Sequence, residues 1–164
     1  MIIGVVRSAH TEPADTPVQS GLNPDEAAVI EMDERYVDGL DGLAEFDFAW
    51  LLTWLGRPGD RPESVSLRQV PYLLSTRPRK IGIFATRGPR RVNPIGLSLI
   101  RVLGVVGSTV RFTGVDVVDG TPVIDVKPYV TAFDRPPITP RCGWFDHVAL
   151  PMGATPASLE RRPS

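Results

Sequence analysis

The residues whose types and spacing best suit chemistry lie at positions 84–96, which we call the arginine loop. It carries Arg87, Arg90, Arg91 and Asn93 among two prolines and two glycines. Proline stiffens such a loop, and glycine lets a ligand approach the backbone closely. Guanidinium groups offer planar, paired donors to phosphate, carboxylate or base edges. The loop therefore predicts a binding site for an anion or a base; the alternative is a solvated surface loop whose arginines pair with acidic side chains.

Acidic residues alternate with apolar ones at positions 116–129, where Asp116, Asp119 and Asp125 stand. Asp125 and Lys127 are two positions apart, so on a strand they share one face. Carboxylates here would suit a positively charged sulfonium or the hydroxyl groups of a ribose. The alternative, which the spacing alone favours, is a hairpin with a polar outer face in which Asp119 serves the turn.

Several kinds of site lack the residues they need. Cys142 is the single cysteine, which excludes an internal disulfide and a cysteine-based zinc site. His10 and His147 are the only histidines, so we expect no metal and no Ser-His triad. A glycine-rich dinucleotide fingerprint and a Walker loop are also missing. The first residues are too short and polar a stretch for a signal peptide, and no apolar run reaches the roughly 18 residues of a membrane helix. We therefore expect a cytoplasmic protein with no membrane partner.

The net charge of −1 hides an uneven distribution of charge. Positions 25–47 carry nine acids and one arginine, whereas positions 77–91, the basic segment, carry six basic residues and no acid. A near-neutral total can therefore conceal a basic face that attracts nucleic acid.

The elements that position these residues are predicted to be short β-strands. The 15 glycines and 17 prolines are scattered, which suits strands joined by turns better than a helical bundle. Apolar or alternating runs predict strands over 2–6, 28–32, 46–55, 81–85, 97–105, 110–117 and 124–127. We expect an all-β fold. Residues 1–150 should form a single compact β-barrel of short, mostly antiparallel strands with long loops. Residues 151–164 should form a flexible tail.

The clearest local signal is the dipeptide Asp119-Gly120, which lies between two β-branched runs. Asp-Gly is the preferred two-residue turn of a β-hairpin. We therefore predict that the runs on either side of this dipeptide pair with each other, and that a second hairpin turns at 104–107.

Separated stretches of the sequence match, in order, those of a known family. They are Ile3-Gly4-Val5-Val6-Arg7-Ser8, Pro17-Val18-Gln19, 39–46 with Trp50-Leu51-Leu52, Gly82-Ile83-Phe84-Ala85-Thr86-Arg87, Asn93-Pro94-Ile95-Gly96-Leu97-Ser98 and 116–129. Through these stretches the chain resembles the TrmO family, also called TsaA-like or YaeB-like. Several separated strings are far more specific than any one motif.

The resemblance implies a β-barrel unrelated to the Rossmann methyltransferases, usually a homodimer. It also implies that S-adenosyl-L-methionine binds in a cleft near the subunit boundary. The implied reaction is methylation of N6 in a threonylcarbamoyl-modified adenosine beside the tRNA anticodon, which makes tRNA the partner.

The resemblance further assigns roles to residues by their positions. The residues expected to contact the cofactor are Val18, Gln19, Ser20, Gly56, Arg57, Arg87, Leu97, Thr113, Gly114, Val115 and Asp116. Arg90, Arg91 and Asn93 are expected to bind RNA. Asp125, Lys127 and Tyr129 are candidates for orienting the substrate, and no general base is assigned.

The chain departs from the family at a few positions. Gly88 and Val92 replace the usual Ser and Pro of the arginine loop, and Gly56-Arg57 stands where many members carry a His beside a polar residue. The extra C-terminal domain of the longer bacterial members is expected to be absent. Because loops carry specificity, two alternatives stay open: a methyltransferase of a small molecule, and a non-catalytic barrel that binds S-adenosyl-L-methionine.

Overall fold

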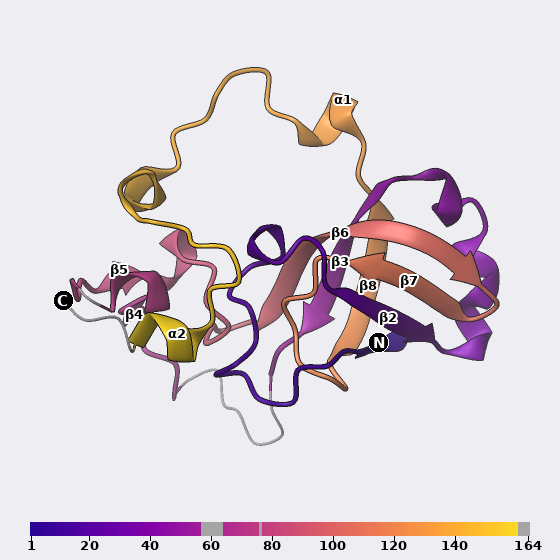
Figure 1. Cartoon of the computed structure of the whole chain (residues 1–164), viewed down its shortest axis with the longest axis horizontal. Helices are drawn as coiled ribbons and strands as arrows, with labels where there is room; N and C mark the ends of the chain where they lie inside the picture. The colour runs from indigo at the N-terminus through magenta and orange to yellow at the C-terminus, as the bar shows by residue number, and fades with distance from the viewer. Residues whose placement is uncertain (57–63, 76, 161–164) are drawn as a thin grey trace.

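The computed structural model describes residues 1–56, 64–75 and 77–160. Its centre is a closed barrel of antiparallel strands in the order β1-β2-β7-β6-β3-β8 (Figure 1). These strands are β1 Gly4–Arg7, β2 Ala27–Met32, β3 Phe48–Trp54, β6 Ile95–Val106, β7 Thr109–Thr113 and β8 Pro122–Pro128. A separate small sheet pairs β4 Arg68–Gln69 with β5 Ile81–Gly82. The predicted all-β barrel is confirmed.

Alternating side chains fill the barrel. On β3, Leu51 and Thr53 face inward and are buried, and on β6 Ser98 and Ile100 do the same. Successive strand residues point to opposite faces, so each strand supplies one row to the core and one row to the surface. The period of two predicted over 46–55 and 97–105 is therefore confirmed in β3 and β6.

Short helices lie at one end of the barrel and around the rest of it. η2 Glu34–Leu40 and η3 Leu43–Glu45 follow β2 and contribute Leu40 and Leu43 to the core. The others are η1 Ser20–Leu22, η5 Tyr72–Leu74, η6 Ile83–Ala85, α1 Thr131–Asp134, η7 Gly143–His147 and α2 Pro156–Glu160. In Figure 1 the chain from α1 to η7 arches away from the barrel, and α2 lies beside β4 and β5. The predicted strand at 81–85 is β5 followed directly by η6.

The Asp119-Gly120 dipeptide does not join two paired strands. Thr121 N–H donates to the Val118 carbonyl (3.2 Å), so the dipeptide forms a β-turn. However, β7 pairs with β2 and β6, whereas β8 pairs with β1 and β3. The predicted hairpin is wrong because this turn fixes only the local chain direction, and Val115 and Val117 are buried in the core instead of entering a strand ladder. The second predicted hairpin is confirmed as the pairing of β6 with β7, but its turn lies at 107–108, and residues 104–106 belong to β6.

Residues 151–160, predicted as part of a flexible tail, pack against the early loop and η5. Val18 N–H donates to the Ala154 carbonyl (2.8 Å), and Ser75 Oγ donates to the Leu159 carbonyl (3.1 Å). Ala154 and Leu159 are both buried. Two buried apolar side chains, too few to form a sequence period, thus join this stretch to the rest of the chain, and the flexibility of the tail stays a prediction. Residues 161–164 lie outside the described part of the chain.

Within the described ranges, no helix has the length and apolar character needed to cross a bilayer. The same residues include no group of three or more His, Cys, Asp or Glu side chains arranged to hold a metal ion.

Candidate functional site

Segments far apart in the sequence meet at the carboxylate of Asp116. Its Oδ2 accepts a hydrogen bond from the backbone N–H of Ser20 in η1 (2.8 Å), and its Oδ1 accepts one from Ser98 Oγ on β6. Ser98 is only 2% exposed. Arg87 of the arginine loop is near enough for its positive charge to act on the carboxyl. We call Asp116, Ser98, Ser20 and Arg87 the Asp116 cluster.

Burial raises the pKa of the Asp116 carboxyl above its ordinary value. The hydrogen bonds from Ser98 and from the Ser20 N–H act in the opposite direction, as does the charge of Arg87. The ionised form of Asp116 therefore depends on its donors. Removing one of them moves the group toward the protonated form.

Arg87 joins the cluster to the exposed side of β6. Its Nη2 donates to the Leu97 carbonyl (3.0 Å), which holds the guanidinium beside the strand. Leu97 is 44% exposed, and its strand neighbour on β3 is Leu52. The structure therefore brings two predicted cofactor residues together: the guanidinium of Arg87 lies beside the exposed side of β6 that carries Leu97.

Gly114 lets the segment before Asp116 pass close to η1 and β6. Its φ of +89° is a conformation that favours glycine, and an added Cβ would lie 3.3 Å from the Leu99 carbonyl oxygen and 3.7 Å from Ser20 Cβ. Val115, which is buried, anchors the same segment in the core. Thr113 ends β7 opposite Ala27. The predicted cofactor segment 113–116 thus lies directly against Ser20.

Val18 and Gln19 lead into η1. Besides the bond from Val18 to Ala154, Gln19 Nε2 donates to the Val18 carbonyl (2.6 Å). Gln19 occupies the N-cap position of η1 but gives no side-chain cap. These two residues therefore adjoin the Asp116 cluster through Ser20, and their role as cofactor contacts stays a prediction.

Gly56 lies where the chain leaves β3. An added Cβ would lie 2.6 Å from Trp54 Nε1 and 3.0 Å from Pro94 Cγ, so this turn packs against the end of the arginine loop. Leu55 N–H donates to the Pro94 carbonyl (2.7 Å), which ties the same two segments together. Arg57, the other cofactor residue predicted from this stretch, lies outside the described residues.

The three residues predicted to bind RNA have different environments. Arg90 and Asn93 are exposed. In contrast, Arg91 Nη1 donates to the carbonyls of Ile83 and Thr86, at 2.8 Å each, and so holds the backbone around η6. Arg90 and Asn93 can meet a partner directly, whereas Arg91 supports the loop that carries them.

The candidates for orienting the substrate lie on β8 and just beyond it. Asp125 and Lys127 form an ion pair (2.7 Å), and Tyr129 packs its ring against Trp50, with ring centroids 6.0 Å apart. By register, Leu52 lies between Leu97 and Asp125 across the sheet. These residues therefore share the outer face that carries Leu97, and no described contact joins them to the Asp116 cluster.

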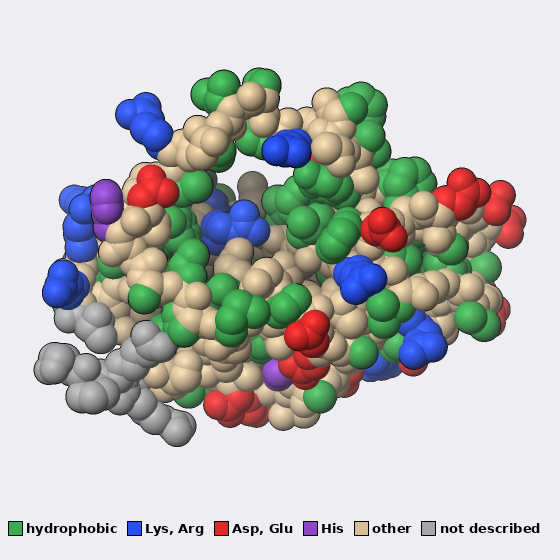
Figure 2. Space-filling view, turned by 45° about the horizontal axis from the view of Figure 1, so that its top comes forward, with side chains coloured by type: hydrophobic (Ala, Val, Ile, Leu, Met, Phe, Trp, Pro, Cys, Tyr) green, Lys and Arg blue, Asp and Glu red, His purple; other side chains and the backbone are tan. Residues whose placement is uncertain are grey.

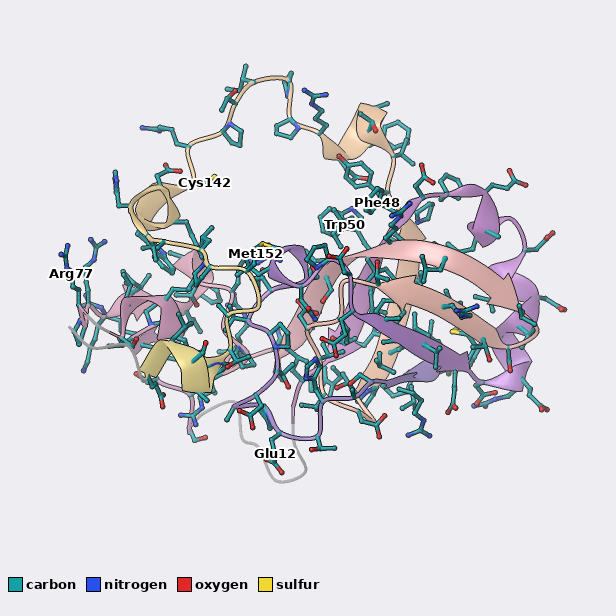
Figure 3. All side chains as sticks on the ribbon, in the orientation of Figure 1. Glu12, Phe48, Trp50, Arg77, Cys142 and Met152 are labelled. Carbon is teal, nitrogen blue, oxygen red and sulfur yellow. The ribbon has the colours of Figure 1, made fainter. Side chains whose placement is uncertain are left out.

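The outer face of β3 and β6 is partly exposed and apolar. Trp54, Ile95 and Leu97 are all exposed there. In Figure 2, hydrophobic side chains surround a hollow under the arched segment between α1 and η7, and a basic side chain is visible within the hollow. Figure 3 shows Trp50 on the side of the barrel that faces this arch, whereas Arg77 lies at the far end near β4 and β5.

Ser98 is the member of the cluster that sequence reasoning missed. It ends one of the strings that carry the family resemblance, yet no role was assigned to it. The available signal was its position: a small polar residue in the inward row of β6, next to Ile100, requires a partner in the core.

The fold and the site together define the class of protein. The chain is a closed antiparallel barrel whose loops gather a buried carboxylate and an arginine. This architecture differs from the open α/β sheet of Rossmann enzymes. The chain belongs to the family described as tRNA-methyltransferase O N-terminal domain, whose model matches residues 5–135.

Curated relatives agree with this assignment. A probable S-adenosyl-L-methionine-binding protein of Pyrococcus abyssi is 36% identical over 88% of this chain and 74% of its own length. A protein of the same description from Methanothermobacter thermautotrophicus is 39% identical over 80% of this chain and 90% of its own length. The mouse tRNA (adenine(37)-N6)-methyltransferase is 34% identical over 82% of this chain, which spans only 31% of the mouse protein.

Solved structures agree as well. The crystal structure of TrmO from Pseudomonas aeruginosa superimposes with a TM-score of 0.66 at 31% identity. The match covers 87% of this chain and 60% of that chain. The chain therefore corresponds to about three fifths of that protein.

Proposed function

We propose that this chain is an S-adenosyl-L-methionine-dependent methyltransferase of tRNA that acts on N6 of threonylcarbamoyl-modified adenosine in the anticodon loop. The observation that carries the proposal is the Asp116 cluster. There, residues 18–20, Arg87, Leu97 and 113–116 gather although they are far apart in the sequence. The names of the relatives support both halves of the proposal, since the archaeal proteins are named for binding the cofactor and the mouse protein for methylating tRNA.

The residues of the site fit the chemistry of the proposed cofactor. S-Adenosyl-L-methionine carries an ammonium group, a carboxylate, ribose hydroxyls and an adenine ring, and when bound it supplies an electrophilic methyl group on a positively charged sulfur. Asp116 can accept from an ammonium or hydroxyl group, and Arg87 can donate to a carboxylate. The exposed faces of Leu97 and Trp54 can cover an aromatic ring.

In this proposal the protein contributes alignment more than acid-base chemistry. Methyl transfer requires that donor and acceptor lie in line, and holding them so converts a bimolecular step into an effectively unimolecular one. Asp116 and Arg87 orient the cofactor, and the apolar outer face beside Leu97 excludes water from the reacting atoms. Asp125, Lys127 and Tyr129 then orient the base from β8.

The basic segment supplies the proposed contact with tRNA. Besides Arg87, which is assigned to the cofactor, Arg77, Arg79, Lys80 and Arg90 are exposed, and no acid interrupts the segment. Positive side chains bind phosphates without regard to sequence, and an anticodon loop presents unstacked bases that can turn into a pocket. A cytosolic location follows from this proposed substrate.

We further propose that the working form is a homodimer. Trp54, Ile95 and Leu97 leave an apolar face partly exposed beside the proposed cofactor site, and a second copy would cover the part of this face that the cofactor leaves open. Light scattering of the purified chain tests this, and a strictly monomeric protein with full activity would contradict it.

The function itself is tested with purified protein, labelled S-adenosyl-L-methionine and tRNA that carries the threonylcarbamoyl group. We expect label in the modified adenosine, identified by nucleoside mass spectrometry. In a deletion strain, we expect the methyl group to be missing from this adenosine of the tRNA. Cofactor binding without transfer to any acceptor would favour a non-catalytic binding protein. Transfer to small acceptors with unchanged tRNA in the deletion strain would favour a small-molecule enzyme.

A further inference from the structure

We propose that Ser98 is a positioning residue for the cofactor: its hydroxyl holds the Asp116 carboxylate, and Asp116 in turn holds the backbone at Ser20. The proposal rests on the proposed function, because it concerns the same cofactor site. Ser98 lies in the inward row of β6 and has no direct part in the expected contacts with the ligand.

The position of Ser98 explains how a core residue reaches the site. It pairs in register with Leu51 on β3, and Ile100 follows it in the same inward row. Most neighbours in that row are apolar, so a hydroxyl there requires a partner inside the protein. That partner is Asp116 Oδ1. The barrel wall therefore anchors a carboxylate in a loop that no strand ladder fixes.

Asp116 passes this constraint on to η1. The N-cap residue of η1, Gln19, provides no side-chain cap, and Asp116 Oδ2 instead accepts the N–H of Ser20. A carboxylate from a distant loop thus takes the place of a local cap. The backbone at residues 18–20, where the family resemblance places cofactor contacts, is therefore positioned through Asp116 and ultimately through Ser98.

The two oxygens of Asp116 give this arrangement its geometry. One is bound to Ser98 and the other to Ser20, so the plane of the carboxylate cannot turn freely. Arg87 is the described charged group whose charge acts on Asp116, and its guanidinium is itself held at the Leu97 carbonyl. Without the Ser98 hydroxyl, the carboxylate keeps Arg87 and Ser20 but loses its anchor to the barrel wall.

The chain offers a matched control for this idea. Thr53 on β3 is also fully buried in the inward row, but its Oγ1 has no hydrogen-bond partner among the described residues. Thr53→Val therefore removes a buried hydroxyl of similar depth that holds nothing. If Ser98 acts only by filling space, the two substitutions should affect the cofactor site alike.

The experiment measures S-adenosyl-L-methionine affinity by calorimetry for the full chain and for Ser98→Ala, Ser98→Thr and Thr53→Val. We expect Ser98→Ala to weaken binding by roughly tenfold to a hundredfold, as expected for a lost hydrogen bond to a charged group. Ser98→Thr, which keeps the hydroxyl, should recover most of the affinity, and Thr53→Val should leave it unchanged. In turnover, Ser98→Ala should raise KM for the cofactor and leave KM for tRNA unchanged.

The pH profile supplies a readout that space-filling alone would not move. Since the Ser98 hydroxyl lowers the pKa of Asp116, its removal should shift the acid-side loss of cofactor binding to higher pH. Wild-type affinity and an unshifted profile in a folded Ser98→Ala variant would overturn the proposal. If that variant does not fold, a Ser98→Thr variant with weakened binding would do the same. Failure of the wild-type chain to bind the cofactor would instead overturn the proposed function.

Discussion

The Asp116 cluster and the basic segment are built in opposite ways. In the cluster, buried donors from β6 and η1 each meet a defined oxygen of one carboxylate. In the basic segment at 77–91, five of the six cations are exposed. Arg91 is tied to two backbone carbonyls, and Arg87, which also belongs to the cluster, is tied to one. The difference fits the two proposed roles: fixed dipoles align a small ligand, and exposed charges meet the phosphates of a polymer.

The largest effect should follow from Asp116→Ala, which removes the centre of the cluster. The variant leaves Ser98 Oγ and the Ser20 N–H without their acceptor and removes the counter-charge of Arg87. We expect cofactor affinity to fall by about a hundredfold or more. Calorimetry measures this, and Asp116→Asn, which keeps the shape but loses the charge, should be intermediate. Unchanged affinity in both variants would show that the cofactor binds elsewhere.

The next effect concerns the barrel wall beneath the cluster. A Cβ at Gly96 would overlap Thr53 Oγ1, so Gly96→Ala should displace the start of β6 and destabilise the fold by about 1–3 kcal/mol. Denaturant unfolding measures the change. Thr53→Ala removes the clashing atom, so the double variant should recover much of the loss. Strict additivity of the two substitutions would contradict this packing.

Arg90 and Arg91 are neighbours in sequence that should respond differently to substitution. Arg90 is exposed, so Arg90→Glu should weaken tRNA binding at low salt by about tenfold, flatten its salt dependence and leave stability unchanged. Arg91→Ala should instead lower stability by roughly 1–2 kcal/mol, because it frees the carbonyls of Ile83 and Thr86. Filter binding across salt concentrations and thermal unfolding separate the two. Equal effects of both variants on tRNA binding and stability would erase the distinction.

Features that depend on neighbouring residues could be predicted from the sequence, whereas features that depend on contacts between distant residues could not. The alternation at 46–55 and 97–105 reports local burial, and it correctly gave β3 and β6. The Asp119-Gly120 turn was recognised, but its strands were paired wrongly because partner choice depends on closure of the whole barrel. The contact from Ser98 to Asp116 joins residues 18 apart in sequence through tertiary packing, so no pattern revealed it. Family likeness supplied most of the site, and those roles remain predictions.

The smallest effect should come from a carboxylate outside both regions, Asp33 at the start of η2. Its side chain accepts bonds from Arg35 Nε (2.9 Å) and Nη2 (2.7 Å), which lower the pKa of Asp33 from 3.8 to about 2. A lowered folded-state pKa means that the pair stabilises the fold above 3.8 and that this contribution is lost as pH falls toward about 2. Asp33→Asn should therefore lower stability only slightly near neutral pH, because the pair is exposed.

The pH dependence of the same variant separates the titration of Asp33 from that of Asp116. The stability difference between wild type and Asp33→Asn should shrink as pH falls from 3.8 toward about 2, as followed by denaturant unfolding. Cofactor binding should stay unchanged in this variant, because Asp33 does not contact the Asp116 cluster. Asp116, whose pKa burial raises, should lose its charge at higher pH than Asp33 does. Cofactor binding should thus fail on acidification while the Asp33 pair is still intact, and loss of both in one transition would mean that binding fails through unfolding.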